Sequence, residues 1–332
     1  MSGARRLRAN LEAWAYLAPA ALVLTVFWFI PVVIALVISF FDAVALTPPG
    51  ELNWVGLAQY RRAFTDDLFV QSLWNTVNYA IYSVPPTLAL SLLAAMLLNT
   101  QVRGRAFFRT AFFLPYITTW VAIAIVFKYI YHREFGLANL ALNTVRVGLL
   151  GLPEFKMDWL GEDSGLIEML LGRDFPAMAF GLDNLLGGPS LALSSIIVTS
   201  IWRDVGYFMI IFLAGLQNID KSYYEACEID GATPFQKFRH ITFPLLSPVT
   251  FFLLIIAGIG AFKEFVAVFV MTPDGGPAYT TAPIVFHMYK VGFEGTWNLS
   301  YASAIAYILT AIILVLTFLQ NRVFGKRVEY DQ

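Results

Sequence analysis

Long apolar runs separated by shorter polar stretches dominate this chain. A bilayer core of about 30 Å needs about 20 residues of helix to cross it, so a run of that length is a candidate span. Six runs qualify, over residues 14–41, 72–98, 107–131, 190–216, 248–271 and 300–321. The pattern predicts an all-α polytopic membrane protein with six transmembrane helices.

Composition supports a membrane environment. Of 332 residues, 58% are hydrophobic and 14% are charged, against about 25% charged in an ordinary soluble domain. The first apolar run is too long for a signal peptide and has no small-residue cleavage site after it. We therefore expect it to be retained as a span.

Basic residues are distributed unevenly between the two sides that six spans define. With the N-terminus inside, the cytosolic segments hold more Lys and Arg than the outer segments, although the outer segments are longer. Such asymmetry follows the positive-inside rule and predicts that both termini lie in the cytosol.

The segments outside the spans divide the chain further. Residues 1–13 are basic and amphipathic and are expected on the inner membrane surface. A membrane domain then covers residues 14–321, with an outer loop at 132–189 and a polar segment at 217–247. The outer loop is glycine-rich, and one or two short helices are expected in it, near residues 165–171. Residues 322–332 form a cytosolic tail.

The polar segment 217–247 has the signals of a helix–turn–helix at the cytosolic membrane face. A helix-length run from Lys221 to Asp230 ends at Gly231, which can adopt the left-handed conformation that terminates helices. Thr233 is then a suitable N-cap, and Pro234 suits the first helical position that follows.

This segment resembles the Glu-Ala-Ala motif of ABC-importer permease subunits of the maltose type, a carbohydrate-uptake family. The matching residues are Glu225-Ala226, Asp230-Gly231-Ala232, Phe238, Ile241 and Pro244. Two positions depart from the family pattern, because Cys227 replaces an alanine and Phe243 replaces a leucine. The similarity continues outside the motif, at Trp54-Val55-Gly56-Leu57, Asn75-Thr76, Arg109-Thr110, Leu114-Pro115, Gly215-Leu216-Gln217 and Gly275-Gly276-Pro277.

The resemblance implies a sugar importer of the prokaryotic inner membrane, in which this chain forms half of a heterodimeric pathway. Its implied partners are a second permease, two ATP-binding subunits that hold ATP and Mg²⁺, and an extracytoplasmic solute-binding protein. The helix near 222–230 would be the coupling helix that contacts the ATPase. The residues assigned to this contact are Tyr224, Glu225, Ala226, Asp230, Gly231 and Ala232. Permeases for glycerol-3-phosphate or another polar solute share many of these features, so they remain an alternative.

Polar residues inside two spans are candidates for the solute pathway, because a charge at bilayer depth usually faces a cavity or a partner. The fourth span carries a helical stripe of Ser200, Arg203, Asp204 and Tyr207, and the fifth carries Gly260, Lys263 and Glu264. The family resemblance places sugar contacts on these two helices, where Tyr207 could stack on a sugar ring. The alternative is that the charges form ion pairs between helices or with the partner permease. Adjacent helical residues point about 100° apart, so Arg203–Asp204 and Lys263–Glu264 are not expected to pair internally.

The sequence lacks the motifs of ATP hydrolysis, nucleophilic catalysis and metal binding. The sequence has no Gly-x4-Gly-Lys-Ser/Thr loop, no nucleophile elbow and no metal-binding histidine spacing. Cys227 is the only cysteine, so a disulfide is excluded. We therefore expect a transport subunit that is not an enzyme and binds no cofactor, metal or nucleic acid. A proton-coupled secondary transporter using Asp204 and Glu264, or a membrane-embedded hydrolase, would be the rival interpretations.

Overall fold

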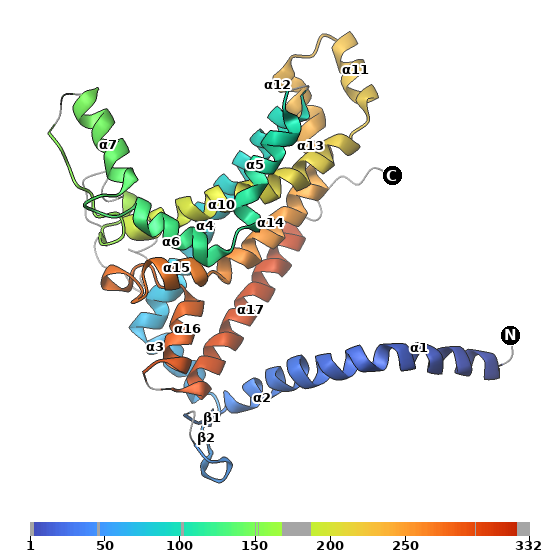
Figure 1. Cartoon of the computed structure of the whole chain (residues 1–332). Helices are drawn as coiled ribbons and strands as arrows, with labels where there is room; N and C mark the ends of the chain where they lie inside the picture. Colours follow the sequence, from blue (N-terminus) through green and yellow to red (C-terminus); the bar gives the residue numbers. More distant parts are fainter. Residues whose placement is uncertain are drawn as a thin grey trace. The chain divides into compact units, whose positions relative to one another are not determined.

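The computed structural model of the chain describes residues 3–44, 47–100, 103–149, 151, 153–167, 187–295 and 297–323. Most of these residues are helical (Figure 1). Internal contacts divide the chain into two units, Met1–Thr65 with Met288–Ile308, and Asp66–His287 with Leu309–Gln332.

The first unit begins with a long apolar helix. It runs through α1 (Gly3–Leu24), a π-helical turn (Thr25–Phe29) and α2 (Ile30–Ile38). Pro31 is the second residue of α2, and the wide turn before it accommodates a ring that would clash with the carbonyl four positions earlier. The predicted boundary between residues 1–13 and the first span is not visible as a break, because α1 is continuous from Gly3.

A short hairpin follows this helix. Strands β1 (Phe41–Asp42) and β2 (Asn53–Trp54) pair antiparallel and flank a 3₁₀ turn (Pro49–Glu51), and α3 (Ala58–Thr65) comes next. The start of α17 (Leu299–Val323) is bound to this region. The Ser300 hydroxyl accepts a hydrogen bond from the Ala43 amide at 2.9 Å. The Arg62 guanidinium lies 4.3 Å from the centre of the Tyr301 ring.

The second unit is built around α4 (Asp67–Asn99) and α10 (Leu191–Asn218), which pack along one another (Figure 1). Side chains cap both helices: Asp66 accepts from two amides at the start of α4, and Ser190 accepts from the Leu193 amide in α10. Such caps satisfy amides that have no partner within the helix. Against this pair pack α5 (Arg105–Ile117) and α14 (Ser247–Phe262).

Small and hydroxyl residues allow close approach between these helices, as is usual in membrane bundles. A Cβ at Gly206 of α10 would fall on the carbonyl group of Phe112 in α5. Ser91 of α4 donates to the Val205 carbonyl of α10 at 3.0 Å.

Two of the predicted spans are broken. The third consists of α5 and α6 (Trp120–Ile130), which meet at a bend of 96°. The fifth consists of α14 and α15 (Val266–Met271), which are separated at Lys263–Phe265. Five helices of the described residues are long and apolar enough to cross a membrane, or six if the bent pair is one span.

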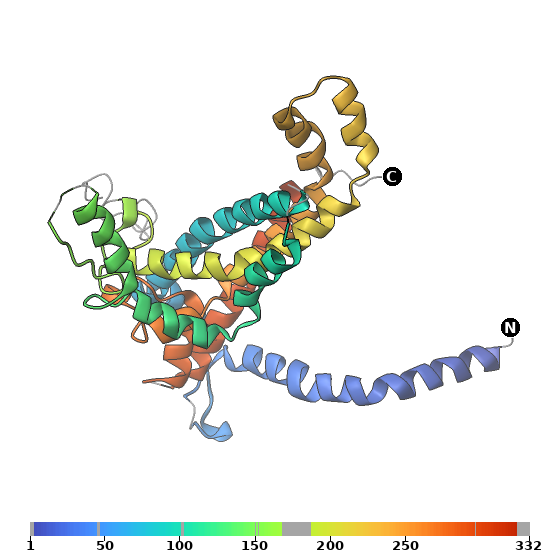
Figure 2. The same cartoon turned by 45° about the horizontal axis from the view of Figure 1, so that its top comes forward.

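The remaining elements lie outside these spans. After α6 comes α7 (Leu137–Gly148), and a 3₁₀ turn (Pro277–Tyr279) precedes α16 (Ile284–Phe293). The helix predicted near 165–171 falls largely outside the described residues. Beyond the C-terminal end of α10, α11 (Lys221–Ile229) and α12 (Pro234–Lys237) form a projecting hairpin (Figures 1 and 2). A π turn (Phe238–Thr242) and α13 (Phe243–Leu245) connect it to α14.

Candidate functional site

A polar cavity of about 210 Å³ lies inside the second unit. Helices α4, α5, α10 and α14 line it, and Glu264 lies at the break after α14. Its lining residues are Tyr79, Ser83, Val84, Thr87, Tyr116, Ser200, Arg203, Asp204, Tyr207, Phe208, Ile256, Ala257, Gly260, Ala261 and Glu264. The polar stripe predicted on the fourth span therefore faces one cavity, because its four residues share a face of α10.

Arg203 and Asp204 form an ion pair with each other, which corrects the sequence-based expectation. The Arg203 Nη1 atom lies 3.0 Å from Asp204 Oδ1. Their Cβ atoms diverge on the helix, but the long arginine side chain turns back across the gap. Both side chains remain partly accessible, at 21% and 28%. The pair therefore keeps exposed polar atoms that a solute could contact.

Aromatic rings surround the arginine. The guanidinium carbon lies 4.6 Å from the centre of the Trp120 ring and 5.2 Å from that of Tyr116. Tyr116 in turn stacks on Tyr207, with ring centres 4.2 Å apart and an interplanar angle of 11°. One face of Tyr207, proposed to stack on a sugar, is thus already covered by Tyr116.

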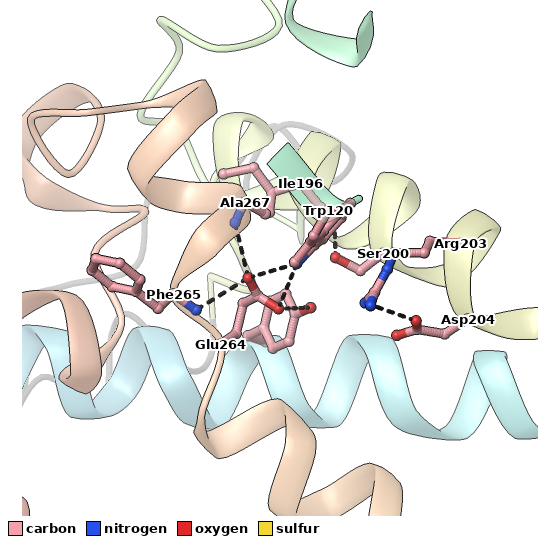
Figure 3. Close-up of polar contacts among 9 residues, drawn as sticks. Trp120, Ile196, Ser200, Arg203, Asp204, Glu264, Phe265 and Ala267 are labelled. Carbon is pink, nitrogen blue, oxygen red and sulfur yellow. Dashed lines mark hydrogen bonds and ion pairs between the residues drawn. The ribbon is translucent and has the colours of Figure 1, made fainter. Parts of the chain in front are cut away.

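Glu264 is held in place by donors from two broken spans (Figure 3). Its Oε1 atom accepts from the Phe265 amide at 3.1 Å and the Ala267 amide at 3.0 Å. The Trp120 indole donates to the same oxygen at 3.2 Å. The two amides belong to the start of α15, where the helix dipole favours a negative charge. Two backbone amides and the Trp120 indole thus stabilise this carboxylate.

Six of the seven predicted pathway residues line the cavity, and Lys263 does not. Lys263 is the C-terminal cap of α14 and its side chain is exposed. Gly260 faces open space, since a Cβ built there meets no atom within 4 Å. Sequence reasoning missed Tyr79, Ser83 and Thr87 of α4, although their spacing of four residues was a readable signal.

The α11–α12 hairpin has the predicted local geometry. Gly231 adopts φ +75°. Its amide donates to the Glu228 carbonyl at 3.1 Å, and the Ala232 amide donates to the Cys227 carbonyl at 2.9 Å. These two bonds define a Schellman motif. Thr233 and Gln236 form a capping box at the start of α12, so the turn is fixed on both sides.

Further contacts hold the hairpin to the chain that follows. Lys237 pairs with Glu228 at 2.6 Å, and the Tyr224 hydroxyl lies 3.0 Å from the Thr242 hydroxyl. Asp220 caps α11 by accepting from the Ser222 amide at 2.9 Å. This hydrogen bond lowers the pKa of the Asp220 carboxyl, because it stabilises the charged form.

The outer surface of the hairpin is available to a partner. Of the residues assigned to the ATPase contact, Glu225, Ala226, Asp230 and Gly231 are exposed, while Tyr224 and Ala232 are half-buried. Ile229 is 87% exposed and Phe235 is 67% exposed. The motif-based prediction did not include these two apolar side chains, which lie on either side of the turn.

No group of metal ligands was found within the part of the chain that the structure describes. A bundle of apolar helices with a polar cavity at two helix breaks is the architecture of a membrane transport component, since broken spans at bilayer depth are tolerated where they line a site.

Comparison with known proteins agrees with this class. The chain belongs to the family of binding-protein-dependent transport system inner membrane components, which matches residues 57–330. It is similar to the lactose transport system permease protein of Rhizobium radiobacter, with 33% identity over 94% of this chain and 93% of that protein. The arabinooligosaccharides transport system permease protein of Bacillus subtilis is 32% identical, over 98% and 92%. The sn-glycerol-3-phosphate transport system permease protein of Agrobacterium fabrum is 30% identical, over 94% of each chain.

Solved structures show the same fold. A chain of a bacterial ABC transporter involved in the import of the acidic polysaccharide alginate superposes with a TM-score of 0.73, over 98% of this chain and 99% of that one. Sequence identity is 19%, so this likeness concerns the fold alone.

Proposed function

We propose that this chain forms half of the translocation pathway of an ATP-driven importer for neutral sugars, with the cavity as its solute site. The observation that carries the proposal is the set of groups in the cavity. Hydroxyls, a partly accessible ion pair and stacked aromatic rings together suit a solute rich in hydroxyl groups. Relatives named for lactose and arabinooligosaccharide transport support the same solute class.

The charge balance of the cavity favours a neutral solute over a phosphate ester. Its charged lining residues are one arginine and two carboxylates, a formal charge of −1. Arg203 is already paired with Asp204, so no lining cation is left to bind a dianion. A relative named for glycerol-3-phosphate transport supports the alternative of a phosphate-ester solute. A phosphate in this cavity would, however, be surrounded by lining residues of net negative charge.

The proposed energy input enters through the α11–α12 hairpin. In this assembly a second permease completes the pore, two ATP-binding subunits hold ATP and Mg²⁺ at the cytosolic face, and a solute-binding protein delivers solute outside. Both termini then lie in the cytosol. Exposed Glu225, Ile229 and Phe235 give the hairpin a mixed polar and apolar surface, as protein interfaces have.

The test is solute-stimulated ATP hydrolysis and uptake by the assembled complex in proteoliposomes. Neutral disaccharides and oligosaccharides are expected to stimulate both, and glycerol-3-phosphate is not. Asp204→Ala and Tyr207→Ala should reduce uptake more than they reduce recovery of the complex. Stimulation by the phosphate ester alone would contradict the neutral-sugar assignment. Uptake that persists without ATP-binding subunits and collapses with the proton gradient would contradict the ATP-driven mechanism.

A further inference from the structure

Helix α7 has its polar and apolar faces reversed relative to an ordinary surface helix. Its polar side chains Asn139, Asn143 and Arg146 face the adjoining chain. Its apolar side chains face outward, with Leu137 61% exposed, Leu140 64% exposed and Val145 53% exposed. A surface helix in water normally buries its apolar stripe and exposes its polar one.

Specific hydrogen bonds fix this orientation. The Asn139 amide nitrogen donates to the carbonyls of Arg133 and Met157, both at 2.9 Å. Its oxygen accepts from the Met157 amide at 3.2 Å and the Trp159 indole at 3.0 Å. Asn139 is 5% exposed, and rotating α7 to hide its apolar face would break all four of these hydrogen bonds.

The rest of the polar stripe is bound in the same way. The Asn143 side chain accepts from the Phe155 amide at 3.0 Å. Arg146 donates to the Pro153 carbonyl at 2.9 Å, and its guanidinium lies 5.4 Å from the centre of the Phe155 ring. Three polar residues at helical spacing thus bind one face of α7 to residues 153–159. The outward apolar stripe is therefore a fixed feature of the fold.

The position of α7 is the second observation about the stripe. Six residues separate α7 from the end of α6, whose exposed residues are mostly apolar and include Val121, Ile125, Val126 and Tyr129, with Lys128 as the one charged exception. Phe135 is 65% exposed and continues this surface toward Leu137. In Figures 1 and 2, α7 lies across the direction of α10 rather than along it. This is the orientation of a helix that lies along a membrane surface and does not cross it.

We propose that α7 is an interfacial helix whose apolar stripe is buried in the outer leaflet of the bilayer. Interfacial helices of this kind immerse their apolar face about 5–10 Å into the boundary between headgroups and acyl chains. A lipid occupant fits better than a docking solute-binding protein, because the stripe carries no charged residue and a partner that leaves each cycle needs a more polar surface.

The anchor would hold the outer end of the pathway. Trp159, bound to Asn139, also accepts through its carbonyl from Ser195 in α10 at 3.1 Å. Through this connection, a lipid-bound α7 fixes the outer end of α10, the helix that carries Arg203 and Asp204. The inference rests on the proposed function only in assigning residues 132–189 to the outer side.

The experiment is nitroxide labelling of the complex in lipid bilayers, in a Cys227→Ser background, which leaves an introduced cysteine as the only label site on this chain. Labels at Leu140 and Val145 are expected to collide with dissolved oxygen more than with a water-soluble nickel chelate. A label at exposed Asp163 of the same outer segment should show the opposite preference, with an oxygen-to-nickel ratio several-fold lower.

Nickel access at Leu140 equal to that at Asp163 would overturn the proposal. A Leu140 label that becomes immobile and shielded from both reagents only when solute-binding protein is added would overturn it in favour of a protein partner. Failure of the transport proposal would appear as absent uptake while the Leu140 label still reported lipid. The two failures are therefore distinguishable.

Discussion

Replacement of Gly231 separates the geometry of the hairpin turn from its size. Gly231 adopts φ +75°, and a Cβ built there meets no atom within 4 Å. An alanine would thus cause no clash, and its whole cost would come from the left-handed backbone. Asparagine tolerates that conformation better than alanine, whereas proline, with φ near −65°, cannot adopt it and has no amide hydrogen.

The size of each effect follows from the backbone conformation and the hydrogen bond that each substitution changes. Alanine in the left-handed region costs about 1–2 kcal/mol, which corresponds to a factor of roughly 5–30 in the population of the native turn. Proline also removes the hydrogen bond from the Gly231 amide to the Glu228 carbonyl, worth about 0.5–1.5 kcal/mol. We expect coupling to fall in the order Gly, Asn, Ala, Pro. Gly148→Ala is the matched control, since a Cβ there is also unobstructed and its φ is not in the left-handed region.

The measurement is the ratio of sugar transported to ATP hydrolysed by the assembled complex in proteoliposomes. Membrane insertion should stay near the native level in all variants of the series, as measured by the amount of complex recovered. A Gly231→Pro complex with the native ratio would refute the role of the turn. Equal losses for asparagine and proline would show that glycine is needed for space at a partner interface and not for backbone conformation.

Three further predictions concern the cavity and the hairpin. Gly260→Trp should abolish uptake by filling the cavity, while Gly260→Ala should be tolerated; native uptake by the tryptophan variant would place the pathway elsewhere. Glu264→Gln should impair assembly or uptake more than Lys263→Gln, because Glu264 accepts hydrogen bonds from two amides, the Trp120 indole and the Tyr79 hydroxyl, whereas Lys263 is exposed. Equal effects would contradict the anchoring role. The pKa of Asp220 is lower in the folded chain than in the unfolded chain. Its stabilisation of α11 is therefore fully present at pH values above the unfolded-state pKa, and it is lost as the pH falls through the folded-state pKa. Hydrogen-exchange protection of the amides at the start of α11 should therefore decrease as the pH is lowered. If protection in Asp220→Asn decreased with pH as much as in the native chain, the Asp220 carboxyl would not be the cause.

Local signals in the sequence were sufficient for the spans and the hairpin. Gly231, Thr233 and Pro234 each have a strong conformational preference, so the turn could be predicted residue by residue. The stripe on α10 was also readable, because helical spacing alone brings its residues to one face. In both cases the determinants lie within one turn or two of the chain.

The remaining features depend on contacts distant in sequence. The break at Lys263–Phe265 contains no proline or glycine, the residues that usually signal a helix break in a sequence. The Arg203–Asp204 pair contradicts the sequence-based expectation, because Cβ directions alone do not show how far an arginine side chain reaches. Helix α7 was not predicted, because its orientation depends on hydrogen bonds between Asn139 and residues 18 and 20 positions away. These bonds bury the polar face of the helix, whereas the local sequence pattern alone would predict that the apolar face is buried.

The two broken spans meet at a single carboxylate, and this explains why the cavity lies where it does. An unbroken helix bonds its own amides internally, so only a break leaves amides free to bind a side chain. Glu264 uses two amides at the start of α15 and the indole of Trp120, the first residue of α6 after the other break. Movement of either half-span must therefore move or break this contact, and the Arg203 guanidinium packs on the same Trp120 ring. We therefore expect a conformational change in α5–α6 or α14–α15 to reach the charged groups of the cavity through this contact, as the alternating access proposed for this chain requires.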